Sequence, residues 1–491
     1  MPLHRLAFLL VSILIPVCLT GSASAAGLDP RFGAVDAFFA ADRADELGVG
    51  WSRVLFPWSR VQPDGPNDWW PAIPDRYLDD EARRGRQLAG VLVSTPRWAA
   101  TAADRWNTTA PRGLDLPVDS PANLWGEYVR RTASAYRGRI DTWVIWNEPD
   151  VSDRGHDGYA WSGSIDEFAR LQKVAYLAAK RGNPEARVTL PGVTYWWDKS
   201  HRRAQFLERY LEVVSRDPDA PANGWYFDAA VLQLYNDPRT LYDATMEYRR
   251  ILDSYGVTKP IWINETNVAP WDDPDRPLTR AHWRANQWEQ ANYFIQAYAM
   301  ALAAGVERLS IYKMSDDAEW RFGWESYGVA RLDDRAPRPV FTALGVAHRQ
   351  YAGVTRGQRQ DLDGAIAVTL WRPDARVTVI WATEPRAVRA RISASGSSAW
   401  VHERDGGGRA VLAVDGQIEV DLAPATHNTV YDRSDLYLTG GPPLIVVEPV
   451  TSGAPTVTVI GRGEPIPDPD VEGGALQRAI AALRAVNAAA R

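Results

Sequence analysis

The chain has 491 residues, of which 45% are apolar and 24% are charged, proportions that are typical of folded globular proteins. Its formal net charge is −6 at pH 7 and it has no long Lys/Arg run, so neither nucleic acid nor an anionic membrane is an expected partner. A neutral substrate fits this charge better. The length exceeds what one hydrophobic core usually supports, so we expect one large domain and a smaller one.

Residues 1–25 have the pattern of an export signal. A basic start precedes an apolar run from Leu6 to Leu19, and Ala23-Ser24-Ala25 offers a small-residue cleavage site. The run is too short to span a bilayer comfortably, so we expect a secreted or periplasmic protein without membrane insertion. Cys18 is the only cysteine and lacks the preceding small residue that lipoprotein processing prefers, so a lipid anchor at Cys18 is not expected. Cleavage after residue 25 would leave no thiol for disulfides, zinc or nucleophilic catalysis.

From Arg31 to Tyr351, short apolar runs alternate with amphipathic segments, which is the pattern of repeated β-α units on a parallel sheet. We expect strands at Phe32–Val35, Ser52–Phe56, Leu88–Ser94, Ile140–Asn147, Arg187–Gly192, Asp228–Tyr235, Pro260–Glu265 and Arg308–Tyr312. We expect helices at Pro121–Arg137, Ile165–Arg181, Ala204–Ser215, Arg239–Tyr255, Asn286–Ala304 and Pro339–Gln350. Eight such units predict an α/β fold, a (β/α)8 TIM barrel over residues 26–352. An open doubly wound sheet is the alternative, but no glycine-rich phosphate loop follows the first strand.

Two of the expected strands end in glutamate. Strand four, in TWVIWNEPD, closes with Asn147 and Glu148, and Pro149 ends it because proline cannot donate to a strand ladder. Strand seven, in PIWINETN, closes with Glu265. A single glutamate at a strand end is as often solvated as functional. Two at the carboxyl-terminal mouth of one barrel, where such barrels place their active sites, suit the cleavage of a glycosidic bond.

These motifs resemble the acid/base and nucleophile motifs of the clan A glycoside hydrolases, most closely those of family 39, with families 5 and 51 also possible. The resemblance covers about residues 31–350 and implies a retaining O-glycosyl hydrolase, with Glu148 as acid/base and Glu265 as nucleophile. It also implies that Asn147 contacts the sugar 2-hydroxyl, that Arg53 in WSRVLFPWSRVQP binds the nucleophile, and that Tyr235 in LQLYNDP is the aromatic residue beside it.

The chain departs from the clan pattern at strand eight, where LSIYKMSDD offers Tyr312 and Lys313 in place of the usual tryptophan, so the identity of the sugar stays open. A guanidinium at Arg53 would keep the nucleophile ionised, whereas burial and the negative partner would keep the acid protonated. The other interpretation of Arg53 is a structural salt bridge. Retention predicts carboxyl groups about 5 to 5.5 Å apart, against about 6.5 to 9.5 Å for inversion.

Tryptophan is abundant, with 22 residues, and flat aromatic faces bind the apolar faces of sugar rings. Trp98 and Trp196 follow strands three and five and are the expected sugar contacts, with Trp320 as a weaker candidate. A tryptophan taken singly is more often a packing residue than a sugar contact. No cofactor or metal is expected, because the histidines are scattered without an HExxH pair and Asp272–Asp275 lacks the spacing of a known calcium loop.

After Tyr351 the sequence changes to short alternating runs, which predict an all-β sandwich over residues 353–449, favoured as a support for the barrel over a glycan-binding module. Residues 450–491 are expected to be a Pro/Gly-rich linker and a short C-terminal helix. The leading functional hypothesis is a secreted retaining glycosidase that cleaves β-linked oligo- or polysaccharides. The alternatives are a barrel that binds glycans without cleaving them and a transglycosylase that uses the same site. Oligomeric state is not indicated.

Overall fold

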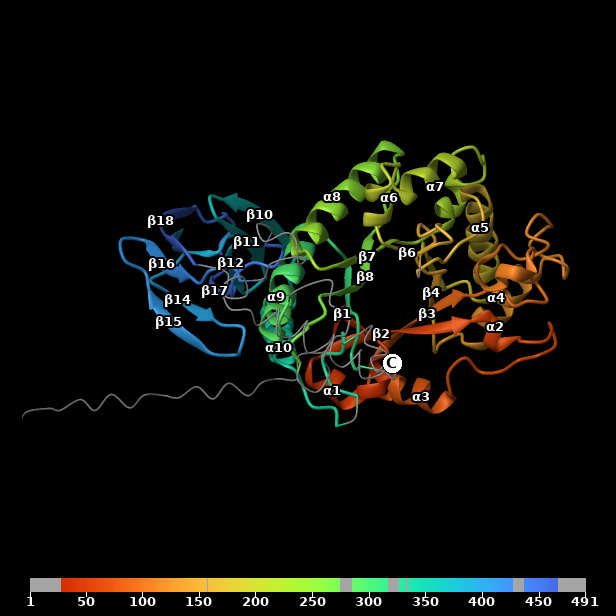
Figure 1. The fold of residues 1–491 in the computed structure, drawn as a ribbon, viewed down its shortest axis with the longest axis horizontal. Coiled ribbons are helices and arrows are strands. Elements are labelled where there is room, and N and C mark those ends of the chain that lie inside the picture. Colours follow the sequence, from red (N-terminus) through yellow and green to blue (C-terminus); the bar gives the residue numbers. More distant parts are fainter. Residues whose placement is uncertain are drawn as a thin grey trace, which may run out of the picture.

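The computed structural model describes residues 28–156, 158–273, 285–316, 326–332, 334–426 and 437–466. A parallel barrel with surrounding helices is followed by a separate region of antiparallel strands packed against one side of it (Figure 1). The expected (β/α)8 barrel followed by a β-sandwich is therefore confirmed. The expected export signal and C-terminal helix lie outside the described residues. None of the described helices is both long and apolar enough to cross a membrane.

The barrel sheet has the strand order β5-β4-β3-β2-β1-β9-β8-β7-β6 within the described residues. Its strands are β1 (Asp29–Val35), β2 (Val49–Pro57), β3 (Gln87–Val93), β4 (Thr142–Ile145), β5 (Arg187–Thr189), β6 (Gly192–Val193), β7 (Ala230–Tyr235), β8 (Ile261–Asn267) and β9 (Arg308–Ile311). The expected fifth strand is divided into β5 and β6, because Pro191 between them has no N–H for a ladder hydrogen bond. β5 pairs with β4 and β6 pairs with β7, and a bridge between Asn147 and Gly192 closes the ring.

The six expected helices are present with shifts of up to three residues at their ends. The α-helices are α1 (Ala41–Glu46), α2 (Trp58–Val61), α3 (Asp75–Arg83), α4 (Leu124–Ala135), α5 (Ile165–Gly182), α6 (Trp196–Ser200), α7 (Phe206–Val214), α8 (Pro238–Ser254), α9 (Gln287–Ala303) and α10 (Pro339–Tyr351). Among the described residues, short 3-10 helices lie at Ala37–Ala40, Ala103–Thr108 and Pro221–Tyr226. Helix α9 is buried on every side, because the barrel and the β-sandwich cover its opposite faces.

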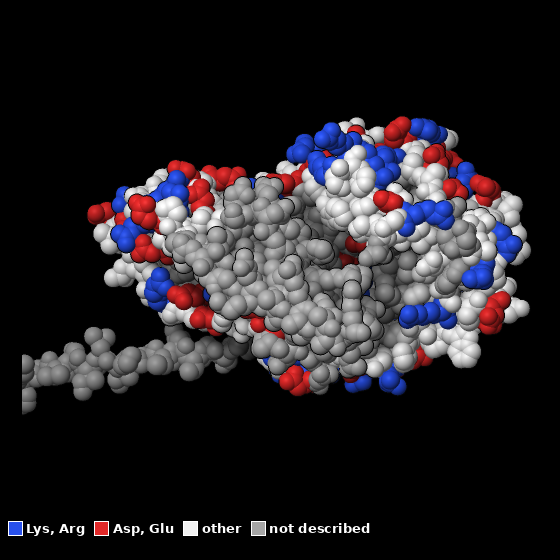
Figure 2. Space-filling view, viewed as in Figure 1, with Lys and Arg blue, Asp and Glu red and all other residues white. Residues whose placement is uncertain are grey.

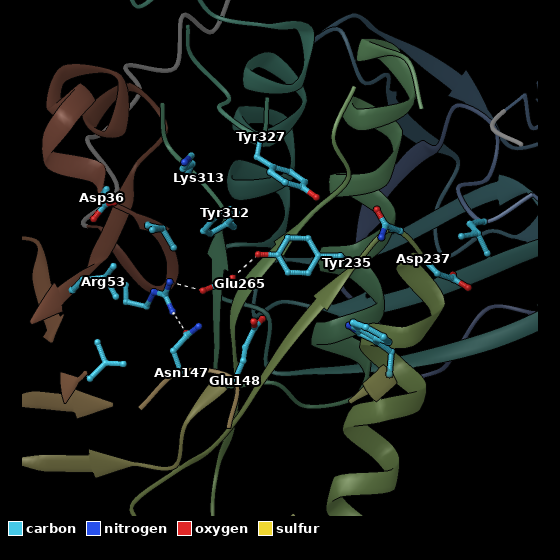
Figure 3. A pocket seen from close by; sticks show the side chains of 16 residues that line it. Asp36, Arg53, Asn147, Glu148, Tyr235, Asp237, Glu265, Tyr312, Lys313 and Tyr327 are labelled. Carbon is cyan, nitrogen blue, oxygen red and sulfur yellow. Dashed lines mark hydrogen bonds and ion pairs between the residues drawn. The ribbon is translucent and has the colours of Figure 1, made fainter. Parts of the chain in front are cut away.

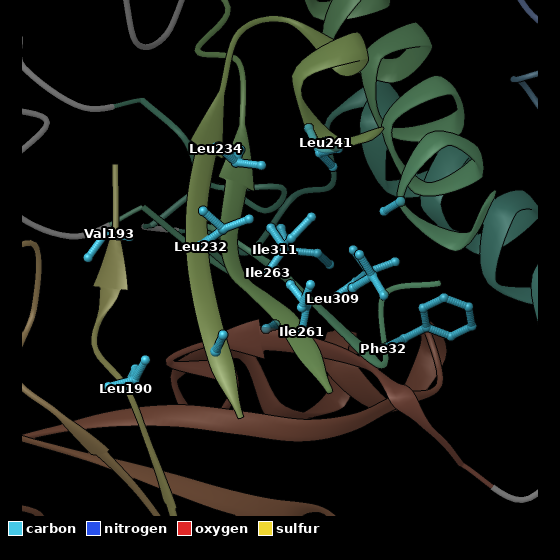
Figure 4. Close-up of a cluster of buried hydrophobic side chains, with 14 of the residues drawn as sticks. Phe32, Leu190, Val193, Leu232, Leu234, Leu241, Ile261, Ile263, Leu309 and Ile311 are labelled. Carbon is cyan, nitrogen blue, oxygen red and sulfur yellow. The ribbon is translucent and has the colours of Figure 1, made fainter. Parts of the chain in front are cut away.

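Strand β8 carries one extra residue relative to both of its neighbours. The register moves between Ile263 and Glu265 against β7, and it also moves against β9. Ile263 packs outside the barrel with Leu232 of β7 and Leu241 of α8 (Figure 4). Trp262 instead faces the barrel interior, where its ring centroid lies 6.0 Å from that of Trp51 of β2. The extra residue is a β-bulge that brings Glu265 back to the interior side, as bulges beside active sites often do.

The antiparallel region forms two sheets, with strand orders β10-β11-β12-β17-β14-β15 and β16-β13-β18. Its strands are β10 (Arg356–Leu362), β11 (Ala365–Trp371), β12 (Ala375–Ala382), β13 (Arg386–Ser393), β14 (Ser398–His402), β15 (Gly408–Leu412), β16 (Gln417–Leu422), β17 (Leu444–Pro449) and β18 (Val457–Pro465). Between the sheets lies a core that includes Ile380, Ile392 and Val446.

The expectation of a linker from residue 450 onward is wrong for residues 457–465. They form β18, which pairs antiparallel with β13, so the β-sandwich extends beyond the expected boundary. Val457 is buried and Thr458 exposed, the alternation of a half-buried strand. The surrounding proline and glycine content concealed this signal in the sequence.

Candidate active site

A cavity of about 940 Å³ opens at the carboxyl-terminal ends of the barrel strands. Its lining brings together Arg53, Asn147, Glu148, Tyr235 and Glu265, all of which were expected from the sequence. Arg53 and Glu265 lie within β2 and β8, Tyr235 ends β7, and Asn147 and Glu148 follow the end of β4. Figure 3 shows Glu148 and Glu265 extending into the same space. On the face drawn in Figure 2, basic and acidic side chains are interspersed and a hollow opens with acidic atoms inside it.

Glu265 lies within strand β8 and is surrounded by donors. Its side chain is only 7% exposed and forms an ion pair with Arg53 at Oε1. Gln233 Nε2 donates to the same oxygen at 2.8 Å, and the Tyr235 hydroxyl donates to Oε2. One positive charge and two neutral donors thus converge on a carboxylate that a rigid strand holds in place, which suits a group that must act as an anion.

Arg53 and Tyr235, which both contact Glu265, have pKa values above their ordinary ones. Burial opposes the charged form of Arg53, but the adjacent Glu265 carboxylate raises the pKa of Arg53 above its ordinary value. Burial, reinforced by the negative charge of Glu265, raises the pKa of Tyr235 well above its ordinary value. Arg53 therefore stays charged and Tyr235 stays protonated, so both donate to Glu265 over the whole working range of pH.

Asn147 is oriented by the same group of residues. Its Oδ1 accepts hydrogen bonds from Arg53 Nη1 at 3.3 Å and from Gln233 Nε2 at 2.8 Å. Because the oxygen is occupied, the amide nitrogen is left to donate to a ligand. Gln233 Nε2 thus links Asn147 to Glu265. The sequence analysis did not identify Gln233 as a residue of the site. The alternation in LQLY places Gln233 on the same face as Tyr235, which is the signal that could have identified it.

Glu148 lies beyond the end of β4 in a different backbone setting. Trp146 and Glu148 have φ values of 72° and 47°, in the left-handed region that non-glycine residues rarely adopt. Glu148 N donates to Gly192 O at 2.9 Å, and Val151 N donates to Glu148 O at 3.0 Å, which fixes this turn. Such strain costs about 1 to 3 kcal/mol per residue and is found mostly at functional sites.

Three tyrosines form a cluster in the cavity wall. The rings of Tyr235, Tyr312 and Tyr327 contact one another at centroid distances of 5.6 to 5.9 Å and all three line the cavity. Lys313 Nζ lies 5.4 Å from the Tyr312 ring centroid, and Asp36 follows β1 on the same side of Glu265 (Figure 3). The sequence did not indicate the roles of Tyr327 or Asp36, because nothing in a loop sequence shows which side chains turn inward.

The three tryptophans expected to contact sugar have different positions. Trp196 begins α6, is 48% exposed and lines the cavity. Trp98 is not part of the cavity lining, because its ring packs edge-on against Trp58 and its Nε1 donates to Gln62 O at 2.7 Å. Trp98 is therefore better explained as a packing residue. Trp320 lies outside the described residues.

Within the described parts of the chain, no group of three or more His, Cys, Asp or Glu residues could hold a metal ion. Asp273, from the acidic run after β8, forms a buried ion pair with Arg338 Nε at 2.7 Å, and Asp316 pairs with the same guanidinium at 2.8 Å. These pairs tie the loops after β8 and β9 to the start of α10, which stabilises that side of the cavity wall.

Several solved structures that share this fold are described as glycoside hydrolases. A family 39 glycoside hydrolase from the gut symbiont Bacteroides cellulosilyticus WH2 matches with a TM-score of 0.59 at 14% identity, over 86% of this chain and 81% of that chain. A GH30 endoxylanase from Clostridium papyrosolvens C71 matches with a TM-score of 0.55 at 13% identity, over 86% and 96%. A glucosidase from Croceicoccus marinus matches with a TM-score of 0.51 at 15% identity, over 84% and 92%.

At such low identities these likenesses establish the fold, and at that level they confirm the expected resemblance to family 39. No protein-family model matches the chain, and no curated protein does.

Proposed function

We propose that the protein is a retaining glycoside hydrolase that cleaves β-linked O-glycosidic bonds of oligo- or polysaccharides by double displacement. The observation that carries the proposal is a pair of glutamates in one cavity with opposite environments. Glu265 is buried and contacted by Arg53, Gln233 and Tyr235, whereas Glu148 lies half-buried on a turn beyond the end of β4. The fold shared with glycoside hydrolases of families 39 and 30 supports the same reaction class.

In the first step Glu265 attacks the anomeric carbon while Glu148 donates its proton to the departing glycosidic oxygen. The bond to the leaving group breaks and a covalent glycosyl-enzyme ester forms. In the second step Glu148, now ionised, takes a proton from water, and that water attacks the anomeric carbon from the side the leaving group vacated. The ester bond breaks, Glu265 is regenerated, and the sugar keeps its anomeric configuration.

Arg53 and Tyr235 hold Glu265 in place for both steps, since both contacts are already formed before substrate binds. The free amide nitrogen of Asn147 is suited to donate to the sugar 2-hydroxyl, a contact that strengthens as positive charge develops at the anomeric carbon. Retention requires the two carboxyl groups to be about 5 to 5.5 Å apart, which stays a prediction.

A screen of the purified protein against aryl β-xyloside, glucoside, galactoside and arabinoside, with a few polymers, tests the activity. Glu265→Ala should abolish turnover of any substrate found, and azide should restore it with inversion, because azide fills the space of the missing nucleophile. Glu212→Ala, at a surface glutamate paired with Arg216, is the matched control and should retain activity. Activity close to wild type in Glu265→Ala would remove the nucleophile role.

Two alternatives remain testable in the same screen. Binding of glycans with hydrolysis of none would favour a non-catalytic barrel, and products extended by added acceptor sugars would favour transglycosylation.

We also propose that the protein is exported, on the pattern of residues 1–25 alone. Amino-terminal sequencing of the mature protein from the cell exterior or periplasm would check this, with a start after Ala25 expected.

A further inference from the structure

A segment of the β-sandwich domain reaches the active-site cavity. Leu438, which lies after β16 and before β17, is part of the cavity lining, whereas the other lining residues among those the structure describes belong to the barrel. Leu438 also borders a small hollow beside Pro238 and Arg239, at the start of α8. The β-sandwich therefore supplies an apolar side chain to the wall next to the exit of β7.

Gln296 of the barrel helix α9 fixes the position of this segment. Its Oε1 accepts from Gly440 N at 3.0 Å and its Nε2 donates to Gly441 O at 2.9 Å, so both ends of one fully buried amide are used. A Cβ on Gly440 would lie 2.2 Å from Trp381, and one on Gly441 would lie 2.2 Å from Ala423 O. Only glycine fits at either position. The two glycines therefore allow the close packing of this segment, and the Gln296 hydrogen bonds fix it against α9.

The two sides of the cavity differ in chemistry. Asp36 and Lys313 lie on one side of Glu265, and Asp237 lies on the other (Figure 3). Trp196 follows β6 and Leu438 lies against the exit of β7, and these two strands are neighbours in the sheet. The second side, called the apolar side below, carries the aromatic and aliphatic surface of Trp196 and Leu438 beside Asp237, whose carboxylate is paired with Arg239.

The apolar side is the one that Glu148 joins, because Glu148 N is bonded to Gly192 O of β6, the strand that leads to Trp196. In the proposed reaction Glu148 protonates the oxygen of the leaving group. The leaving group must therefore lie on the side of Trp196 and Leu438.

We propose that Leu438 is a specificity-determining residue that contacts the leaving group, and that Gln296 is the positioning residue that holds it there. This inference rests on the proposed function and extends it to a substrate class: glycosides whose leaving group presents a flat apolar face, such as an aryl ring or the apolar face of a second sugar. The β-sandwich is then a part of the binding site as well as a support for the barrel.

The experiment compares two substrates with the same sugar, an aryl β-glycoside and the corresponding glycosyl fluoride, whose leaving group has no apolar surface. In Leu438→Ala the ratio of kcat/KM for the aryl glycoside to that for the fluoride should fall about tenfold, carried by KM, as for the loss of a small apolar contact in a pocket. Gln296→Leu, which is similar in volume but makes neither hydrogen bond, should lower the same ratio. Leu412→Ala, at a 73% exposed leucine of the β-sandwich, is the matched control and should leave the ratio unchanged.

An unchanged ratio in Leu438→Ala would overturn the inference, while the proposed function would stand. If wild type cleaves neither substrate, the proposed function fails instead, and titration of the aryl glycoside into wild type and Leu438→Ala by calorimetry still decides the contact: equal affinities overturn it, and an affinity about tenfold weaker supports it. Should Gln296→Leu fail to fold, Leu438→Ala remains decisive because Leu438 is only half-buried.

Discussion

The two glutamates of the cavity are positioned in opposite ways. Glu265 lies inside strand β8, with every residue from Ile261 to Asn267 buried and three donors on its carboxylate. Glu148 lies three residues past the end of β4, half-buried, on a turn with left-handed backbone at Trp146 and Glu148. Glu265 is therefore fixed deep in a buried strand by three side-chain donors, whereas Glu148 is presented half-buried on a turn of unusual backbone geometry.

This difference matches the two tasks of double displacement. A nucleophile must stay ionised and must not move while the ester forms and breaks, which favours burial and fixed donors. An acid/base must release and recover a proton in each turnover and must reach both the leaving oxygen and water, which favours access to the cavity. Changes at each glutamate should therefore fail in different ways.

The largest expected effect is a loss of activity that depends on the leaving group when Glu148 is changed but not when Glu265 is changed. Glu148→Ala should lower kcat/KM by about 10²- to 10⁴-fold for substrates with poor leaving groups, the usual contribution of a general acid, and far less for dinitrophenyl glycosides, which need no protonation. Glu265→Ala should lose turnover on both kinds of substrate. Azide should give a product of retained configuration with Glu148→Ala. Equal losses of Glu148→Ala on good and poor leaving groups would contradict the acid role.

Arg53→Lys should produce the next largest effect, a loss of about 10²- to 10³-fold in kcat, as for removal of one preorganised donor. Lysine keeps the charge but cannot span Glu265 and Asn147 as the guanidinium does. Steady-state kinetics on the substrate found in the screen measures this loss. Arg86→Lys, at a buried arginine paired with Glu81 away from the cavity, is the control; it should lower the Tm without changing kcat.

Tyr235→Phe should have a smaller effect, about 10- to 100-fold in kcat, because a hydrogen bond to a charged group contributes about 1.5 to 3 kcal/mol. Burial raises the pKa of Tyr235 well above its ordinary value, so in wild type the hydroxyl stays protonated and donates to Glu265 throughout the working range of pH. Tyr293→Phe removes a buried hydroxyl that bonds Thr266, next to Glu265, but does not line the cavity. If both variants lose activity equally, the Tyr235 contact is structural.

The sequence predicted the part of this site that follows from strand exits. Because parallel strands of one barrel end at the same mouth, Glu148 and Glu265 had to meet once their strands were recognised, and Arg53 and Tyr235 followed from the family resemblance. It could not predict the β-bulge in β8, since simple alternation from Ile263 would have turned Glu265 outward. A bulge is visible only in the pairing register with the neighbouring strands.

Other parts of the site depend on long-range packing. Leu438 reaches the cavity through contacts between the β-sandwich and α9, which no local pattern encodes. Trp98 was chosen because it follows a strand, but the sequence does not show that Trp58 and Gln62 already occupy its ring and its N–H. Strand β18 was missed because its alternating run is flanked by proline and glycine, which locally favour a linker.

The last prediction concerns Asp150, which lies just beyond the end of β4, and its effect is on stability rather than on turnover. This side chain is almost fully buried two residues after Glu148, and its Oδ2 accepts from Thr194 N at 2.9 Å and from Thr194 Oγ1 at 2.6 Å. Burial raises the pKa of Asp150 to about 6, although the bonds from Thr194 act to lower it. The contact ties the Glu148 turn to the segment that carries Trp196.

Because the folded carboxyl binds its proton more tightly than an unfolded one with a pKa of 3.8, the stabilisation is complete below that value and is lost as pH rises through 6. Asp150→Asn mimics the protonated form at every pH. Its free energy of unfolding, minus that of wild type, should therefore increase between pH 4 and pH 7 by at most about 3 kcal/mol, a bound set by 1.36 kcal/mol per pKa unit. Denaturant unfolding at pH 4, 5, 6 and 7 measures this. A difference that stays constant would mean that Asp150 is ionised in the folded protein, and that the Glu148 turn is held by a charge.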